Sequence, residues 1–254
     1  MDELLRATYE AERGHFWYRG FRDFVEPLLA QAAQGVSHAR ILDCGCGTGA
    51  NLPLLGRYGV AFGFDLTWTG LTYAAAAGHQ RIACATVARA PFPDGSFDVV
   101  TSFDVLYCLE DEAERDAIGE MYRLVRPGGA VVVNVSAMEI LTGDHSIFDG
   151  ERRRYSRGQL GSALERAGFR VTRITHTNAS IFLPMLAVRL LQRARRAGTA
   201  AVAKSDFAMP PGPVNRVLSL LLAAEARLLR LVDLPVGSSI LCLARKPALH
   251  DATS

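Results

Sequence analysis

The sequence lacks a hydrophobic run long enough to cross a bilayer, and it lacks a strong excess of either charge. Apolar residues make up 49% of the 254 residues, but none of their runs approaches the roughly 18 residues of a membrane span. The 28 basic and 26 acidic residues leave a net charge of +2, which is no global field for nucleic acid. No internal repeat or low-complexity tract is present. The length therefore suits one large domain, or one domain with an inserted subdomain.

Cysteine is also scarce, with 5 residues in the chain. An odd number of thiols, mostly in apolar strand contexts, predicts reduced cysteines and a cytoplasmic protein. Cys44 and Cys46 are spaced as metal ligands can be, but no second pair or histidine cluster completes a set, so we expect no metal. The start, Met1-Asp2-Glu3, lacks the apolar segment of a secretion signal.

What the sequence does contain is a glycine-rich turn. The apolar run at 40–43 ends in Asp43, then Gly45, Gly47 and Gly49 alternate with small residues, and a helical pattern follows at 50–57. Glycine lets the backbone approach a ligand, and the N-terminus of a helix offers free N–H groups to it. A strand, turn and helix in this order predict a nucleotide-type cofactor site.

Strand and helix patterns alternate after this turn, which predicts an α/β fold with a mostly parallel sheet. The remaining strands are predicted at 60–65, 81–85, 97–103, 130–135, 169–175 and 237–246, and the helices at 71–77, 112–125 and 159–167. Arg126-Pro127-Gly128-Gly129 is predicted to stop the helix before the strand at 130–135.

Two segments stand outside this alternation. The first 38 residues are predicted as a helical segment rich in aromatic and arginine residues, acting either as a lid on the ligand or as a helix packed on the core. Helices at 181–194 and 214–232, joined by a breaker-rich link, form an insertion before the last strand. The expected organisation is an N-terminal lid (1–38), a core (39–179), the insertion (180–236), the last strand (237–247) and a disordered tail (248–254).

Two cofactors fit the glycine turn at first sight. Gly45-x-Gly47-x-x-Ala50 satisfies the dinucleotide fingerprint, which is a weak signal alone. Asp43, two residues before the first glycine, would repel a pyrophosphate but suits a cationic ligand. An NAD-dependent oxidoreductase is therefore the less favoured interpretation.

Four motifs together resemble the class I S-adenosylmethionine-dependent methyltransferases, of the small bacterial type. The resemblance covers about residues 39–177 and 238–246. It is carried by ILDCGCGTG at 41–49, by Asp65, which lies 20 residues after Gly45, by PFPDGSFDVV at 91–100, and by RPGG at 126–129.

The resemblance implies a Rossmann-like seven-stranded sheet with an antiparallel last strand. It implies that S-adenosylmethionine is bound and leaves as S-adenosylhomocysteine. The glycine turn and Asp43 would hold its methionine part, Asp65 its ribose, and Val87 and Ala88 its adenine. The candidate cofactor residues are Asp43, Gly45, Cys46, Gly47, Gly49, Asp65, Leu66, Val87, Ala88 and Phe103.

Some of these residues have simpler alternatives. Many family members carry Asp where Thr86 stands, so a hydroxyl would make a weaker contact with the adenine amino group. Asp43 and Asp65 could instead cap the helices that follow them. Asp98 is expected to be a structural turn acid.

The acceptor is less clearly marked. Relatives often carry His where Cys108 stands, and no Asn-Pro-Pro-Tyr-like motif of nucleic-acid methyltransferases is present. We therefore expect a small-molecule or lipid-like acceptor, with oxygen favoured over nitrogen or carbon, and no nucleic acid. His145 is the candidate base, against a solvated loop histidine as the alternative. The candidate acceptor residues are Trp17, Tyr18, Asp104, Tyr107, Arg154 and Tyr155.

Three alternatives stay open at this point. Arg153, Arg154 and Tyr155 resemble an R-R-Y segment of a bacterial subgroup and could bind an acidic acceptor group, or pack on acids of the protein. The 180–235 insertion could shape an acceptor pocket, contact an anionic membrane at its inner face, or form a homodimer. A catalytically silent module that keeps the cofactor fold is the second functional class.

Overall fold

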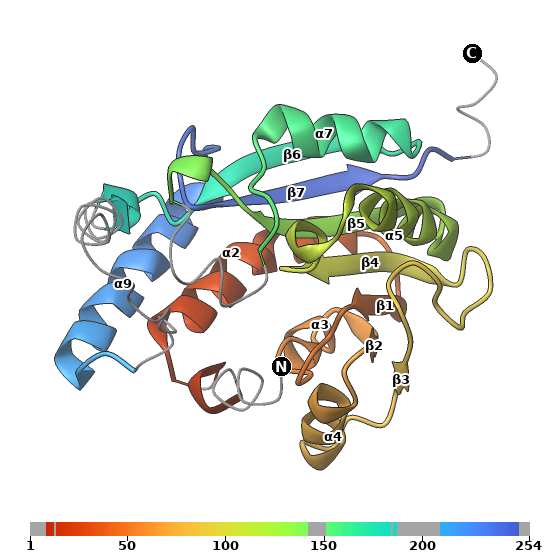
Figure 1. The fold of residues 1–254 in the computed structure, drawn as a ribbon, viewed down its shortest axis with the longest axis horizontal. Coiled ribbons are helices and arrows are strands. Elements are labelled where there is room, and N and C mark those ends of the chain that lie inside the picture. The colour runs from red at the N-terminus through yellow and green to blue at the C-terminus, as the bar shows by residue number, and fades with distance from the viewer. Residues whose placement is uncertain (1–8, 13, 142–150, 184, 187–208, 249–254) are drawn as a thin grey trace.

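The computed structural model describes residues 9–12, 14–141, 151–183, 185–186 and 209–248. Its centre is a seven-stranded sheet with the order β3-β2-β1-β4-β5-β7-β6. Strand β7 is antiparallel to both of its neighbours, and the other strands run parallel (Figure 1). The Rossmann-like sheet that the resemblance implied is therefore confirmed. The strands are β1 (Ala39–Cys44), β2 (Gly59–Asp65), β3 (Ile82–Cys84), β4 (Phe97–Phe103), β5 (Val125–Ser136), β6 (Arg170–Thr177) and β7 (Ser239–Arg245).

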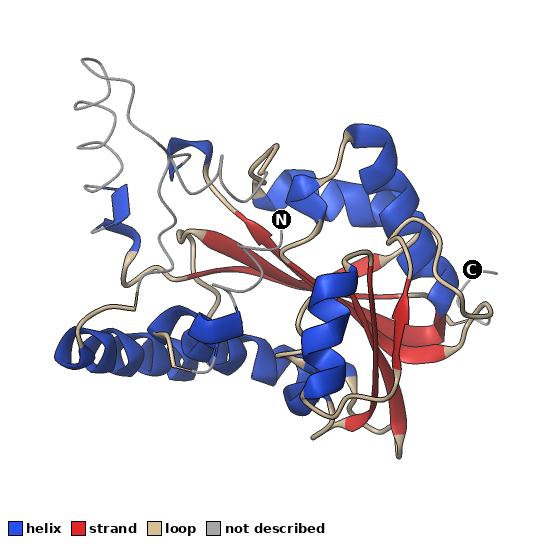
Figure 2. Ribbon diagram, turned by 60° about the horizontal axis from the view of Figure 1, so that its bottom comes forward, coloured by secondary structure: helices blue, strands red, loops and turns tan. Residues whose placement is uncertain are grey.

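Helices cover both faces of the sheet (Figure 2). Leu42 and Val131 point to one face, where α5 (Asp111–Leu124) and α7 (Arg157–Arg166) bury their apolar sides. Their neighbours Ile41 and Val132 point to the other face, against α2 (Phe16–Ala32), α3 (Leu52–Leu55) and α9 (Gly212–Leu229). Successive residues of a strand face opposite ways, so apolar runs such as that of β5 are needed to fill both layers.

Several boundaries differ from the sequence prediction; α4, for example, starts at Trp68 rather than 71, and β6 ends at Thr177 rather than 175. The helix expected at 50–57 is reduced to α3, which starts at Leu52 with Pro53 in its first turn and is capped by Gly56. Strand β5 starts at Val125 rather than 130, because Val125 pairs with Phe97 before the register shifts. The predicted stop after α5 is confirmed, but the chain continues as a strand instead of a free turn.

Helices α2 and α9 lie side by side beneath the sheet, although about 200 residues separate them (Figure 1). The Asn215 side chain joins their N-terminal ends, because its Oδ1 accepts from Phe16 N at 2.8 Å and its Nδ2 donates to Gly14 O at 2.9 Å. Gly20 faces Leu222 so closely that a Cβ on Gly20 would lie 2.5 Å from Leu222 Cδ1. The predicted helix at 214–232 thus belongs to the core layer, while most of the one at 181–194 lies outside the described residues.

Among the described residues, no helix combines the length and the apolar character that crossing a membrane requires.

We expect Gly20→Ala to destabilise the protein by about 1–3 kcal/mol, because a methyl group overpacks the contact with Leu222. Gly119 on α5 is the matched control, since a Cβ there meets nothing within 4 Å; Gly119→Ala should stabilise by about 0.5–1 kcal/mol. Urea unfolding of both variants measures the difference. In a Leu222→Ala background the cost of Gly20→Ala should shrink in part, because Cδ1 and Cγ are removed while the Cβ at 2.8 Å remains. An equal cost in both backgrounds would contradict this packing.

Candidate functional site

The order of the strands reverses direction between β1 and β4. The chain leaves β1 toward β2 on one side and returns to β4 on the other. In open α/β sheets, ligands bind at such a reversal, beyond the carboxyl ends of the strands. The glycine turn follows β1, Asp65 ends β2 and Asp104 follows β4, so the topology brings three of the predicted segments to one edge.

The glycine turn adopts a backbone that side chains disfavour. Gly45, Gly47 and Gly49 have φ values of 81°, 51° and 78°, in the left-handed region that glycine enters without a steric penalty. A Cβ on Gly45 would lie 2.4 Å from Val105 Cγ2. The N–H groups of Gly45 and Cys46 both donate to the carbonyl of Phe64 at 2.9 Å. The turn is therefore held between β2 and the residues that follow β4.

Asp65 supports the turn from the end of β2. Its Oδ2 accepts from Gly47 N at 2.8 Å, and its Oδ1 accepts from Thr67 N at 2.7 Å and from the Thr67 hydroxyl. Thr67 is the N-cap residue of α4 (Trp68–Ala76). Asp65 thus holds the N-cap residue of this helix in place, but it is not itself the cap that the alternative expected. Its contact with a ribose stays a prediction; Oδ2 accepts one hydrogen bond here and has a second lone pair for another.

Asp43 is a carboxylate sealed inside the protein, with 1% of its surface exposed. Its Oδ1 accepts from the hydroxyl of Thr101 on β4 at 2.7 Å. Burial raises the pKa of Asp43 to about 7, and the nearby charge of Asp65 adds to the rise. Among the described residues, none of the ion pairs includes Asp43. A cationic ligand would supply the missing compensation.

The other predicted cofactor residues surround this edge. Cys46 is buried against Gly63, and burial raises the pKa of its thiol. Leu66 is exposed, whereas Phe103 is buried, and its ring centroid lies 5.2 Å from that of Phe21. Val87 and Ala88 are half-buried, in a tight turn where Ala88 N donates to the Thr86 hydroxyl at 3.4 Å. Their contacts with a cofactor stay predictions.

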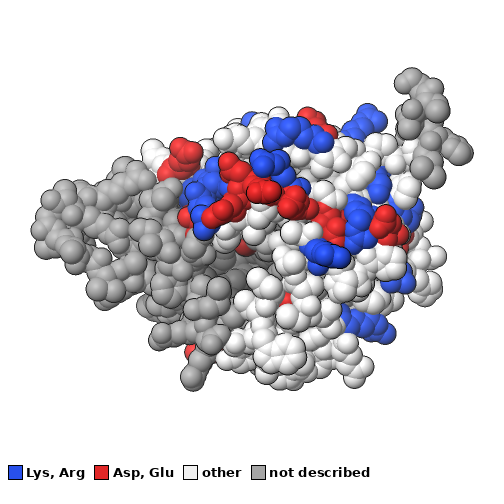
Figure 3. Space-filling model, turned by 45° about the vertical axis from the view of Figure 1, so that its right-hand side comes forward, with Lys and Arg blue, Asp and Glu red and all other residues white. Residues whose placement is uncertain are grey.

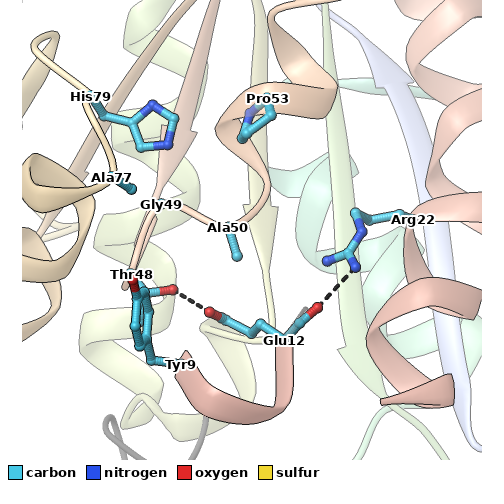
Figure 4. A pocket seen from close by; sticks show the side chains of 9 residues that line it. All are labelled: Tyr9, Glu12, Arg22, Thr48, Gly49, Ala50, Pro53, Ala77 and His79. Carbon is cyan, nitrogen blue, oxygen red and sulfur yellow. Dashed lines mark hydrogen bonds between the residues drawn. The ribbon is translucent and has the colours of Figure 1, made fainter. Parts of the chain in front are cut away.

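A pocket of about 200 Å³ lies on the other flank of the turn (Figure 4). Here Thr48 Oγ1 donates to Glu12 Oε2 at 2.5 Å, and Arg22 Nη2 donates to Glu12 O at 2.9 Å. Burial raises the pKa of Glu12. The ring of Tyr9 stacks on Tyr73 of α4 at 4.4 Å. The aromatic and arginine-rich segment was predicted from the sequence, but the hydrogen bond between Glu12 and Thr48 was not.

Residues before α2 therefore reach the glycine turn. This contact is one that the lid hypothesis requires, but closure over a ligand stays a prediction. The body of α2 packs in the core, where Phe24, Val25 and Leu28 are buried.

Asp104 is fixed by a residue that sequence analysis did not identify. Asn134 Nδ2 donates to Asp104 Oδ1 at 2.8 Å, and Asp104 N donates to Asn134 O at 3.1 Å. Asn134 is 4% exposed and lies on β5 opposite Phe103. Only the register of the two adjacent parallel strands identifies Asn134, and the sequence alone does not reveal that register.

Comparison with known proteins agrees with this geometry. Residues 42–133 match the family model described as a methyltransferase domain. The chain belongs to the class I S-adenosylmethionine-dependent methyltransferases.

Two relatives show how diverse this family is. A Bacillus subtilis protein, provisionally named a 23S rRNA (guanine-N(1)-)-methyltransferase, is 32% identical over 149 residues. This match covers 52% of the present chain and 50% of the relative. The malonyl-[acyl-carrier protein] O-methyltransferase of Herminiimonas arsenicoxydans is 30% identical over 160 residues, covering 59% of the chain and 60% of the relative. The chain thus spans about half to three fifths of the length of these relatives.

Among solved structures, a Haemonchus contortus phosphoethanolamine N-methyltransferase shares the fold. Its TM-score is 0.59 at 19% identity, and the match covers 97% of this chain and 58% of that one. That structure contains S-adenosylhomocysteine and phosphomonomethylethanolamine.

The residues predicted to contact the methyl acceptor are only partly gathered. Trp17 and Tyr18 are half-buried on α2. Tyr107 is 8% exposed, and its carbonyl accepts from Arg152 N at 2.9 Å. His145, the candidate base, lies outside the described residues.

The R-R-Y segment is anchored inside the methyltransferase. Arg153 pairs with Glu114 at 3.0 Å and with Asp111 at 2.8 Å, and the Tyr155 hydroxyl donates to Glu114 at 2.5 Å. Burial raises the pKa of Tyr155. Arg154 pairs with Glu151 at 2.9 Å. The structure shows the packing alternative for Arg153, and these partners favour a structural role for Tyr155. Acceptor contacts of Arg154 and Tyr155 stay predictions.

Charges elsewhere are mixed in sign. On the face drawn in Figure 3, basic and acidic side chains lie next to one another. A cleft of about 430 Å³ is lined by both signs, and Arg152 pairs there with Glu110 at 3.1 Å. Within the described part of the chain, no group of three or more His, Cys, Asp or Glu side chains could hold a metal ion. All 5 cysteines are free.

Asp43→Asn should reverse the cost of burying this carboxylate. Because the folded-state pKa is raised from 3.8 to about 7, the folded protein binds more protons than the unfolded one between these values. The free energy of unfolding therefore falls as the pH rises through this window. We expect Asp43→Asn to match the wild type near pH 4 and to exceed it by about 2–4 kcal/mol at pH 8.

Urea unfolding across this pH range measures the effect, with Asp116→Asn on the exposed face of α5 as the control. If Asp43→Asn were less stable than the wild type at pH 8, the ionised carboxylate would be stabilising. The raised pKa of Asp43 in the folded protein would then be wrong.

Proposed function

We propose that the chain transfers the methyl group of S-adenosylmethionine to a small-molecule or lipid-linked acceptor, on oxygen rather than nitrogen or carbon. The observation that carries this proposal is the buried Asp43 carboxylate beside the left-handed glycine turn. S-adenosylmethionine bears a sulfonium and an ammonium group, and either positive charge would compensate a carboxylate held away from water. A pyrophosphate would be repelled by it, which argues against a dinucleotide.

Methyl transfer depends mainly on the alignment of the acceptor with the S–CH₃ bond. The S–CH₃ bond breaks with its electron pair going to sulfur, and the acceptor's lone pair forms the new bond to carbon. The sulfonium is already reactive, so holding the acceptor in line and excluding water provide most of the rate. A hydroxyl acceptor must also lose its proton, which calls for a base within hydrogen-bonding reach.

Support for a small acceptor is indirect. The net charge of +2 and the mixed charges of Figure 3 lack the one-signed surface that binds nucleic acid. The relatives named above include one named for rRNA and one for an acyl-carrier protein. The alternative of a catalytically silent binding module remains, motivated by Cys108 in the place of a histidine.

Calorimetry with S-adenosylmethionine, S-adenosylhomocysteine and NAD tests the cofactor. We expect the first two to bind and NAD not to bind. Asp65→Ala should weaken S-adenosylmethionine binding by about 1–3 kcal/mol, because hydrogen bonds to a charged acceptor are lost. Asp116→Asn should leave the affinity unchanged.

Tight binding of NAD without S-adenosylmethionine would overturn the proposal. Transfer of a labelled methyl group to a cell extract would separate an enzyme from the silent module.

An exposed apolar face on α9 supports the lipid-linked acceptor. Its exposed side chains include Val214, Val217, Leu220, Leu221 and Leu228. The exposed charged residues of this helix are Arg216, Arg227 and Arg230.

The exposed charged side chains of α9 itself are of one sign, although Asp23 of α2 lies near Arg227. The acid of α9, Glu225, is buried and accepts from Ala179 N and Ser180 N at 2.8 Å. Arg230 has a distant partner in Glu26 at 3.9 Å. Apolar side chains flanked by arginine are complementary to a surface of anionic lipid.

The protein should co-sediment with vesicles rich in phosphatidylglycerol, and it should not co-sediment with vesicles of phosphatidylcholine alone. The double variant Val217→Glu/Leu228→Glu should bind at least about tenfold more weakly, because it removes buried apolar area and adds repulsion. Ala75→Glu, on the exposed side of α4, is the matched control. Unchanged sedimentation together with loss of a dimer in light scattering would identify this face as a contact between copies instead.

A further inference from the structure

One side chain at the carboxyl end of β4 is held in place by three independent contacts of its segment. Asp104 has a φ of 60°, a left-handed conformation that residues with a side chain rarely adopt, Asp and Asn more readily than others. Its backbone N–H and its Oδ1 are both bound by Asn134, at 3.1 and 2.8 Å. The residue is nevertheless exposed, whereas Asn134 is buried.

The neighbours of Asp104 in the chain are fixed as well. Phe103 lies in edge contact with Phe21 of α2. Val105 packs on Gly45, where no side chain would fit. Asp104 therefore lies between two residues that contact a core helix and the first glycine of the turn, at the carboxyl end of β4 where the strand order reverses.

We propose that the Asp104 carboxylate lies on the acceptor side of the transferred methyl group, beside the reacting atom of the acceptor. Asn134 is its positioning residue. This inference rests on the proposed function, because it assumes that the donor lies on the glycine turn. It narrows the acceptor to a group whose reacting oxygen or nitrogen carries a hydrogen.

The hydrogen bond from Asn134 to Asp104 shows why an amide side chain suits this position of β5. A neutral N–H₂ donor aims one carboxylate oxygen without adding a charge to the site. With a hydroxyl acceptor, the O–H proton passes to the Asp104 carboxylate as the O–CH₃ bond forms. The electron pair of the S–CH₃ bond goes to sulfur. The proton is released to water after the methylated product leaves.

Sinefungin tests this arrangement without an identified acceptor. In sinefungin an aminomethyl carbon replaces the methylated sulfonium, so an ammonium group lies where the methyl group would be. A carboxylate facing this position should favour sinefungin over S-adenosylhomocysteine. The readout is the ratio of the two dissociation constants within each variant, measured by calorimetry, because general damage to the site affects both ligands alike.

We expect the wild type to prefer sinefungin, and Asp104→Asn to lower this preference by about tenfold with little change in S-adenosylhomocysteine affinity. Asn134→Leu keeps a side chain of similar volume without the donor and should lower the preference by a smaller factor. Asn134→Ala is the second variant if the leucine does not fold. Asp116→Asn should leave the preference unchanged.

The outcomes separate the two proposals. Failure of both ligands to bind the wild type would overturn the cofactor assignment itself. Normal S-adenosylhomocysteine binding with an unchanged preference in Asp104→Asn would overturn only the role of Asp104. An equal loss of both ligands in the Asn134 variants would show that Asn134 has a structural role and positions nothing.

Discussion

The Asp43 carboxylate accepts a hydrogen bond from Thr101 on the next strand and is otherwise enclosed by protein that raises its pKa to about 7. A carboxylate in this position costs free energy in the empty protein. Under the proposed function a bound cation would recover this cost, and β1 would then supply part of the binding energy in advance. The glycine turn and the neighbouring strand ends are arranged around this carboxylate.

The surroundings of this carboxylate are assembled from distant parts of the chain. Asp65 holds the turn through Gly47, and Val105 closes on Gly45. Helix α2 reaches the same edge through the contact of Phe21 with Phe103, and α9 holds α2 in place from the far end of the sequence. Stability of the outer helix layer and geometry of the site are thus coupled, although α9 is remote from the turn in the sequence.

The sequence was sufficient for the existence of the strands and of the glycine turn, because both depend on local patterns. Apolar runs define β1 and β5, and positive φ values at Gly45, Gly47 and Gly49 follow from glycine itself. Boundaries were less predictable where tertiary pairing decides, as at Val125. The role of Thr101 and Asn134 could not be predicted, because each acts through a side chain whose partner lies on an adjacent strand.

The internal partners of Arg153 and Tyr155 were also beyond the sequence. A basic triplet resembles a binding site until its neighbours are known, and here Glu114 of α5 lies against both side chains. The position of Asp104 was predicted from its place after a strand, but its backbone conformation was not.

The antiparallel strand β7 lies between β5 and β6, so the middle of this half of the sheet is supplied by residues 239–245. When β6 has just been synthesised, its neighbour in the finished sheet does not yet exist, and the edge of β5 has no partner on that side. Pairing between segments so far apart in sequence is slow, and unpaired strand edges are prone to aggregation while they wait. The free edge of β5 must therefore be protected until residues 239–245 have been made, and β7 then completes the sheet from the inside.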